Sequence, residues 1–250
     1  MLSRTWATSR RALSRGGTWT ALVWSALFVI LLVAGLLLVG GNALLSAMVH
    51  PHFTGSPLMS PTQAKQILLG MLALYGVLLV VGPFFMAGIY GMFGEVVKDR
   101  PVSWGTFWSM GKKLYGRGWG LYLYLLIYAI VLGIVGGILG GLLHVVGLVV
   151  LMLAIIASFP WLLRMTAGLF VDQYTWGQSF KASFMGARYL ALLGTMLLSV
   201  LFYGVILVAI FKATSFLGVF GLALYFACEM VLSIVGPVWF FALYRAAQHT

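Results

Sequence analysis

The sequence predicts an all-α integral membrane protein, and two observations support this fold class. Hydrophobic residues fill 62% of the 250 positions and charged residues only 8%, whereas about 25% of residues are charged in soluble domains. Six apolar stretches are also long enough to cross about 30 Å of hydrocarbon. This composition excludes an ordinary soluble enzyme and a disordered chain, and the single cysteine, Cys228, excludes a disulfide scaffold.

The apolar stretches predict six transmembrane helices within one domain of residues 1–250. They cover approximately residues 19–41, 66–93, 118–142, 145–170, 189–211 and 217–244. The third and fourth meet at Gly140-Gly141, and the fifth and sixth are joined by Lys212-Ala213-Thr214-Ser215. Connections this short predict antiparallel hairpins.

The positions of Lys and Arg predict a multi-pass protein of the cell membrane with both termini in the cytoplasm. Thirteen of the fifteen basic residues lie in the N-terminal tail, in the second connection, between the end of the fourth span and the start of the fifth, and at the end of the sixth span. Only Lys65 and Lys212 fall on the opposite side. Cytoplasmic loops carry the excess of positive charge, so this side is expected to face inward.

The N-terminal tail also contains Ser9-Arg10-Arg11-Ala12-Leu13, which is similar to a twin-arginine signal. The apolar run from Ala21 to Val39 is too long for the hydrophobic region of an ordinary signal peptide, and no small-x-small cleavage site follows it. We therefore expect this run to be a retained first span.

Three prolines predict an internal repeat. Pro83, Pro160 and Pro237 are separated by 77 residues in both steps, and each lies late in an even-numbered span. A proline inside a helix removes one backbone hydrogen bond and kinks the helix. Repetition at one spacing therefore predicts three helical hairpins of the same, parallel topology. The units cover approximately residues 5–93, 103–170 and 175–247.

Short amphipathic helices are predicted on the cytoplasmic side before each odd-numbered span. These segments begin Thr5-Trp6-Ala7, Ser103-Trp104-Gly105 and Thr175-Trp176-Gly177, in which Ser or Thr is a natural N-cap. In the third segment Trp176 and Phe180 oppose Lys181 and Arg188, and the first segment has little beyond Trp6 and Leu13.

The second of these segments has the clearest amphipathic pattern. A helical wheel places an aromatic and apolar face opposite Thr106, Ser109 and Lys113. The apolar face consists of Trp104, Phe107, Trp108, Leu114 and Tyr115. Such a helix is expected to lie along the inner leaflet, with this face towards lipid or the helix bundle.

Several of these runs resemble YesL-type bacterial membrane proteins or similar six-span families of unassigned function. The resemblance rests on Gly82-Pro83-Phe84-Phe85-Met86-Ala87-Gly88-Ile89-Tyr90, on Val97-Lys98-Asp99-Arg100-Pro101-Val102-Ser103, and on Phe107-Trp108 followed by Lys112-Lys113. The shared pattern is a proline-containing span, a basic stretch and an aromatic segment that ends in lysines. It implies a membrane protein and assigns no chemistry.

Glu229 is the one acidic residue predicted to lie inside a span. The 77-residue repeat places Tyr75 at the same depth, and Ser199 lies at a similar depth in the fifth span. Ionised groups cost about 2.5–3.5 kcal/mol at the centre of a membrane helix, so a protonated carboxyl or a polar cavity is expected. Glu229 therefore either couples proton movement to transport or joins helices through hydrogen bonds worth about 1 kcal/mol.

Other candidate sites favour a structural interpretation. His50 and His52 could supply two metal ligands in the long outer connection, but zinc requires three or four, so a solvated loop without metal is expected. The glycines of the third span form small-xxx-small patterns that predict close packing within the chain, with a dimer face as the alternative. They are Gly133, Gly136, Gly137, Gly140 and Gly141.

The sequence therefore predicts a protein that is not an enzyme and needs no cofactor. Paired carboxylates, a nucleophile with its base and a P-loop are all missing from the sequence. The net charge of +11 is concentrated on the inner face, where anionic lipids rather than nucleic acid account for it. We expect a non-enzymatic module that acts through contacts with lipids and with a partner membrane protein or a second copy. The alternative is a small-solute transporter or permease subunit with Glu229 as its coupling residue.

Overall fold

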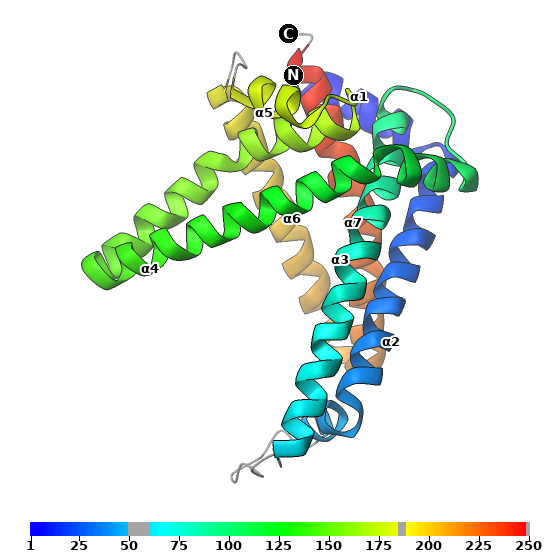
Figure 1. The fold of residues 1–250 in the computed structure, drawn as a ribbon. Helices are drawn as coiled ribbons and strands as arrows, with labels where there is room; N and C mark the ends of the chain where they lie inside the picture. The colour runs from blue at the N-terminus through cyan, green and yellow to red at the C-terminus, as the bar shows by residue number, and fades with distance from the viewer. Residues whose placement is uncertain (50–60, 185–188, 249–250) are drawn as a thin grey trace.

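The computed structural model describes residues 1–49, 61–184 and 189–248, and every secondary-structure element in these ranges is helical (Figure 1). The helices are α1 (Leu2–Leu13), η1 (Gly16–Trp19), α2 (Thr20–Val49), α3 (Pro61–Val97), α4 (Trp104–Phe170), α5 (Trp176–Phe184), α6 (Tyr189–Thr214), η2 (Ser215–Leu217) and α7 (Gly218–Gln248). Five helical stretches in the described ranges are long and apolar enough to cross a membrane. The prediction of an all-α protein with long membrane-type helices is confirmed.

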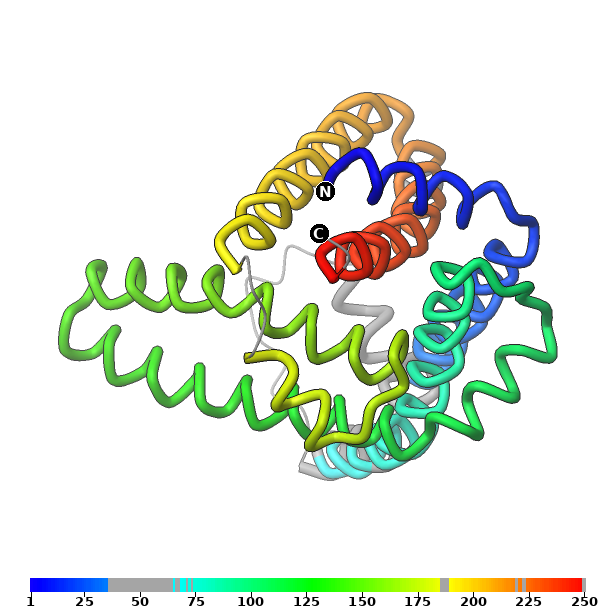
Figure 2. Tube along the Cα trace, turned by 90° about the horizontal axis from the view of Figure 1, so that it is seen from above, coloured from blue at the N-terminus to red at the C-terminus, as the bar shows by residue number. Residues whose placement is uncertain are grey.

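The long helices form hairpins that diverge from one end of the molecule. α2 packs along α3, and α6 packs along α7. α4 reverses its direction at His144, so its two arms run side by side and project away from the other helices (Figures 1 and 2). We call the end that carries α1, α5, both termini and the start of α4 the base, and the opposite ends of the hairpins the tips (Figure 1).

The hydrophobic core lies at the base. The largest fully buried side chains come from α3, both arms of α4, α6 and α7, and include Phe93, Phe107, Phe170, Leu192 and Leu243. Towards the tips, by contrast, Leu142 is 74% exposed and Phe220 is 85% exposed. Packing within the chain therefore holds the hairpins together at the base and leaves the outer parts of their surfaces apolar and exposed.

Two tip turns share an uncommon backbone conformation. His144 has φ 47° and ψ −123°, and Gly218, which begins α7, has φ 57° and ψ −128°. Three residues further on, a glycine packs against backbone from the preceding helix. A Cβ atom on Gly147 would lie 2.0 Å from the Leu139 carbonyl oxygen, and one on Gly221 would lie 1.8 Å from that of Thr214. The short connections predicted at these two points are therefore tight reversals of the same design.

The three repeated prolines lie inside helices, Pro83 in α3, Pro160 in α4 and Pro237 in α7. In the first two cases a tyrosine donates a hydrogen bond to the carbonyl three residues before the proline. Tyr115 reaches the Val80 oxygen at 3.0 Å, and Tyr189 reaches the Ala157 oxygen. A proline leaves backbone acceptors in the preceding turn without a helical donor, and these hydroxyl groups supply one nearby.

The predicted N-caps are confirmed in two of the three amphipathic segments. The backbone N–H of Ser103 donates to Thr106 Oγ1 at 3.0 Å before α4, and that of Thr175 donates to Gln178 Oε1 at 3.0 Å before α5. The prediction for Thr5 is wrong because α1 already begins at Leu2. Thr5 lies inside the helix, where its hydroxyl donates to the carbonyl of Met1, one turn earlier.

The amphipathic segment at Trp104 is not a separate helix, because it continues into the third predicted span without a break. Its expected faces are confirmed in part. Phe107 and Leu114 are fully buried, and Ser109 and Lys113 are exposed, but Trp104 and Trp108 remain about half exposed at 49% and 51%. The apolar face thus lies against the bundle at Phe107 and is open at its two tryptophans.

The tip turns give a prediction about stability. A non-glycine residue at positive φ stores about 1–3 kcal/mol of strain, which exceeds the entropy cost of about 0.5–1 kcal/mol for glycine. We expect His144→Gly to raise the unfolding temperature of the detergent-solubilised protein and Gly218→Ala to lower it. His144→Ala, which keeps the strain and removes the imidazole, is the control and should change little. An equal loss in His144→Gly and His144→Ala would show that the imidazole, not the backbone, matters at this turn.

Candidate functional site at the base

The base contains three of the four acidic residues of the chain, and Glu95 on α3 is the most enclosed of them. Its side chain is buried, with residue exposure of 5%. One carboxylate oxygen accepts a hydrogen bond from Arg100 at 3.0 Å, and the other accepts from the amide of Gln173 at 3.2 Å. Glu95 therefore joins the end of α3 to the connection that follows α4.

Asp172 makes the corresponding link between that connection and α7. Its Oδ2 atom accepts a hydrogen bond from the Tyr244 hydroxyl at 2.5 Å and one from Gln248 at 3.0 Å. Arg245, the next residue of α7 after Tyr244, donates to the carbonyl of Val97 at the end of α3. The ends of α3, α4 and α7 are thus joined by polar contacts to one another.

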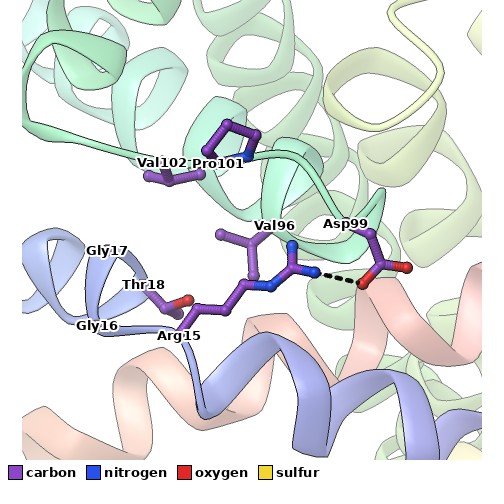
Figure 3. Close-up of a pocket in the computed structure, with 8 residues that line it drawn as sticks. All are labelled: Arg15, Gly16, Gly17, Thr18, Val96, Asp99, Pro101 and Val102. Carbon is purple, nitrogen blue, oxygen red and sulfur yellow. Dashed lines mark hydrogen bonds and ion pairs between the residues drawn. The ribbon is translucent and has the colours of Figure 1, made fainter.

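Asp99 forms a third contact of this kind, between the α3–α4 connection and the N-terminal segment. Its carboxylate lies 3.0 Å from Arg15 and 3.7 Å from Arg11. The Arg15 side chain crosses a pocket of about 380 Å³ to reach it (Figure 3). The pocket is floored by Val96 and closed on one side by Gly17, where a Cβ atom would lie 2.0 Å from the Val102 carbonyl oxygen.

Lys98 lies between these acidic groups. Partial burial lowers the pKa of its amine, and the negative charges of Glu95 and Asp172 oppose that effect. The nearby guanidinium groups of Arg100 and Arg245 act in the same direction as burial. Lys98, Arg100 and Arg245 thus lie close enough to Glu95 and Asp172 to form one network of charges at the base.

The first aromatic cluster attaches the start of α4 to the first hairpin. Phe107 stacks on Trp24 of α2 with ring centroids 3.9 Å apart and planes 8° apart, and Phe85 of α3 lies 5.3 Å from Phe107. Trp104 and Trp108 meet the same Trp24 ring edge-on at 5.1 and 5.5 Å. Three of the five side chains that the sequence placed on one helical face, Trp104, Phe107 and Trp108, therefore converge on a single partner ring.

The second cluster attaches α5 to the second hairpin. Trp161, which follows Pro160, lies 6.0 Å from Phe180 and 5.3 Å from Phe184 of α5. Trp176 approaches the first arm of α4 so closely that a Cβ atom on Gly120 would lie 1.4 Å from its indole nitrogen. Trp176 and Phe180 thus occupy the positions in this cluster that Trp104 and Trp108 occupy in the first.

The third contact closes a ring of hairpins. α1 packs along α7, and Trp6 meets Trp239, two residues after Pro237, edge-on at 6.2 Å. Each amphipathic segment therefore packs on the proline-containing helix of the preceding hairpin, and the first segment packs on the last hairpin. The sequence predicted the three segments but not the helices on which they pack.

An apolar pocket of about 310 Å³ lies where the hairpins meet. Met86 of α3, Leu163 of α4 and Phe240 of α7 all line it, and these residues are 77 positions apart. Tyr90 and Thr166 supply hydroxyl groups to the lining. The pocket is thus formed by corresponding positions of the three predicted repeats.

The predicted intramembrane polar site consists of residues on three different helices. Glu229 is exposed on α7, and Tyr75 is 62% exposed on α3. Ser199 on α6 accepts a hydrogen bond from Trp239 at 2.9 Å and donates to the Thr195 carbonyl at 2.7 Å. Within the described ranges no hydrogen bond joins any two of these three residues, so a shared site stays a prediction.

The glycines of the third span were predicted to pack closely within the chain, and two of the five do so. Gly136 packs within the chain, since its Cβ atom would lie 2.8 Å from Leu151, and Gly140 lies 3.9 Å from Leu148 by the same measure. The other three glycines of the third span, residues 133, 137 and 141, have no described atom within 4 Å of such a Cβ. His50 and His52 lie outside the described residues, and the metal prediction is not tested there.

Glu95 and Asp172 are functional candidates that the sequence reasoning missed. Glu95 and Asp172 are 77 residues apart, as the prolines are. Extending the repeat beyond the prolines to the acidic residues could have identified them as corresponding positions. Their partners, Gln173 and Tyr244, could not have been found in this way because neither contact follows from the repeat alone.

The two kinds of acidic contact differ in expected contribution to stability. Glu95→Gln places an amide N–H₂ group against the donors of Arg100 or Gln173, and a buried donor without an acceptor costs about 1–3 kcal/mol. Asp99→Asn removes ion pairs at a carboxylate that is 41% exposed, so we expect a loss below about 1 kcal/mol. Unfolding of both variants in detergent, compared with the wild type, measures the difference. Equal losses would mean that Glu95 is not a structural contact of the base.

No family model, curated protein or solved structure matches this chain. The resemblance to YesL-type membrane proteins therefore stays a prediction from the sequence. The assignment of a function rests on the geometry of the base and of the surfaces around it.

Proposed function

We propose that the chain is a six-span, non-enzymatic membrane module whose base lies at the cytoplasmic leaflet and acts through lipid and partner-protein contacts. The number of spans follows if α4, which reverses at His144, crosses the membrane once with each arm. Each arm is apolar over more than the roughly 20 residues that a crossing requires. α2, α3, α6 and α7 then supply the other four crossings.

The parallel three-hairpin arrangement is supported by features that recur at corresponding positions. Two tyrosines bond to carbonyls just before Pro83 and Pro160, and two tip turns share one backbone conformation. The central pocket is lined by equivalent residues of all three units. Each aromatic contact at the base joins one unit to the next, which is the pattern expected of repeats arranged around an axis along the membrane normal.

The orientation is supported by the charges of the base. The amphipathic segments carry exposed cations, among them Arg10, Lys112, Lys113 and Lys181. The acidic residues Glu95, Asp99 and Asp172 are already engaged in contacts within the base. The surplus positive charge therefore faces outward at the level where aromatic side chains and anionic headgroups meet.

This arrangement of internally paired acidic groups and outward cations is the observation that carries the proposal. Three segments with aromatic faces and exposed lysine or arginine are held in place at one end of the molecule, as interfacial helices are when they lie on a membrane surface. A partner membrane protein or a second copy would meet the exposed apolar surfaces of the hairpins. The base would then position these surfaces relative to the inner leaflet.

A transporter or permease subunit remains the second candidate, with Glu229 as the coupling residue. The observation that favours it is the electrostatic proximity of Glu229 to Tyr203 on the neighbouring α6. Against it, Glu229 does not line the pocket at Arg15, the central pocket or the groove beside Pro237, and the central pocket is lined almost entirely by apolar side chains. An apolar meeting point of hairpins is more typical of a packed module than of a hydrated path.

Labelling of introduced cysteines tests the orientation. In a Cys228→Ser background, Leu142→Cys at a tip should react with an impermeant thiol reagent on intact cells, because the tips face outward in this proposal. Ser109→Cys at the base should react only after the cells are lysed. The reverse pattern would place the base outside and contradict the orientation.

Reconstitution in lipid nanodiscs tests the function. Anionic lipid should raise the unfolding temperature of the wild type over that in zwitterionic lipid, because headgroups neutralise the cations of the base. The combined variant Lys112→Gln, Lys113→Gln and Lys181→Gln should lose this gain. The matched control, Lys65→Gln with Lys212→Gln, removes exposed cations of the other side and should keep it.

Two results would contradict the proposal. An unfolding temperature that is insensitive to anionic lipid in the wild type would remove the basis for a lipid-contacting base. Proton flux into liposomes that depends on the wild-type protein and disappears in Glu229→Gln would favour the transporter instead.

A further inference from the structure

The third hairpin differs from the other two in the space beside its proline-containing helix. A groove of about 580 Å³ lies between α1, α6 and α7, within the size range of ligand pockets. Its lining is almost wholly apolar and includes Leu2 and Trp6 of α1, Leu198 and Phe202 of α6, and Leu232 and Trp239 of α7. Leu198 and Phe202 are also 63% and 68% exposed, so the groove is continuous with the outer apolar surface of the hairpin.

The corresponding spaces of the first two hairpins are filled by the protein itself. Phe107 and its neighbours pack against Trp24 beside Pro83, and Phe180 and Phe184 pack against Trp161 beside Pro160. Beside Pro237 only Trp6 is supplied in this way, through its contact with Trp239. The structure therefore places an unfilled apolar space where two related positions hold aromatic side chains.

The sequence explains why the third space is open. Each amphipathic segment begins with a tryptophan, and the residue four positions later differs between them. It is Trp108 after Trp104 and Phe180 after Trp176, both aromatic, but it is Arg10 after Trp6 in α1. Residues four apart lie on the same side of a helix, so Arg10 follows Leu2 and Trp6 along the side that borders the groove. The position that carries an aromatic ring in the other segments here carries an exposed cation.

The proline-containing helix of the third hairpin, α7, also differs from those of the other two hairpins in the hydrogen bonds near its proline. In the first two hairpins Tyr115 and Tyr189 donate to the carbonyl three residues before the proline. In the described part of the chain no side chain donates to the equivalent carbonyl, that of Ile234. Both the aromatic filling and the tyrosine contact are thus replaced at the third hairpin by a groove that opens to the outer surface.

We infer that this groove binds one acyl chain of an anionic phospholipid, whose headgroup lies at Arg10. The inference rests on the proposed placement of the base at the inner leaflet and adds a specific site to it. The paired tryptophans Trp6 and Trp239 mark the headgroup level at the mouth of the groove, as interfacial tryptophans do. From there the lining runs along α6 and α7 towards the tips, in the direction that an acyl chain follows in a bilayer. The chain supplies the apolar volume that aromatic residues supply at the other two hairpins.

The groove can be closed by one substitution. Gly236 lies in its lining, and the nearest described atom to a Cβ atom built there is Cε2 of Tyr203 at 3.9 Å. Gly236→Phe therefore adds its Cβ atom without a close contact, and we expect its ring to occupy the groove. Gly194→Phe is the matched control, because Gly194 is an exposed residue of α6 with no described atom within 4 Å of a Cβ at that position.

Photo-crosslinking and native mass spectrometry test the site in the full-length protein. The probe is phosphatidylglycerol with a diazirine in its acyl chain, and phosphatidylcholine with the same chain is the comparison. In the wild type we expect crosslinks in residues 198–206 and 232–240 and one phospholipid that is retained on delipidation. Gly236→Phe should retain it about tenfold less well, a loss of about 1.4 kcal/mol, and Gly194→Phe should not. Arg10→Gln should keep the crosslinked positions and lose the preference for phosphatidylglycerol.

Three outcomes would overturn the inference. Crosslinks spread equally over the exposed arms of α4 would indicate ordinary surrounding lipid, and retention unchanged in Gly236→Phe would exclude the groove. Crosslinks between these peptides and a second protein chain would identify a helix as the occupant. The nanodisc result keeps the two proposals apart, since stabilisation by anionic lipid in Gly236→Phe would leave the proposed function standing without this site.

Discussion

The arrangement of this protein depends on the packing of each amphipathic segment on the proline-containing helix of the preceding hairpin. Few contacts within the chain hold the hairpins together near their tips, where large apolar side chains are exposed. Burying an aromatic side chain contributes about 1.5–3 kcal/mol. Trp24 and Phe107 are buried at the first junction and Tyr124 at the second, while the two rings of the third junction are partly exposed. The direction of every hairpin is therefore set at one end, by Trp24 with Phe107, by Trp161 with Phe180, and by Trp239 with Trp6.

The polar network adds specificity to these apolar contacts. A buried carboxylate is costly unless its oxygens are hydrogen-bonded, so Glu95 tolerates only an arrangement that brings Arg100 and Gln173 to it. Asp172 requires the last turns of α7 to approach in the same way. In a chain with fifteen basic and four acidic residues, cations outnumber the acidic groups available to pair with them, and several described cations, among them Lys112, Lys113 and Lys181, are exposed at the surface.

Much of the local structure could be predicted from the sequence, because it depends on nearby residues. Hydropathy located the long helices, Ser103 and Thr175 marked two helix starts, and Gly140-Gly141 indicated the reversal that occurs at His144. The ring of hairpins could not be predicted, because nothing local to Trp6 shows that its partner is Trp239, more than two hundred residues away in the chain. The prediction that Thr5 begins a helix was wrong because a threonine can also lie inside a helix, where its hydroxyl donates to a carbonyl of the previous turn.

Closure of the ring explains why α1 carries fewer large apolar side chains than the other two segments. The face of α1 that packs into the base is made of small residues, Thr5, Ser9 and Ala12, which are buried at 0%, 3% and 1% exposure. Small side chains allow two helices to approach closely, so the contact with α7 depends on backbone proximity more than on large rings. Trp6 is then displaced to the edge of the contact, where it meets Trp239 and stays 63% exposed. Because Trp6 stays at this edge and Arg10 stands where the other two segments carry a second aromatic ring, the close contact of α1 with α7 leaves the space beside Pro237 open.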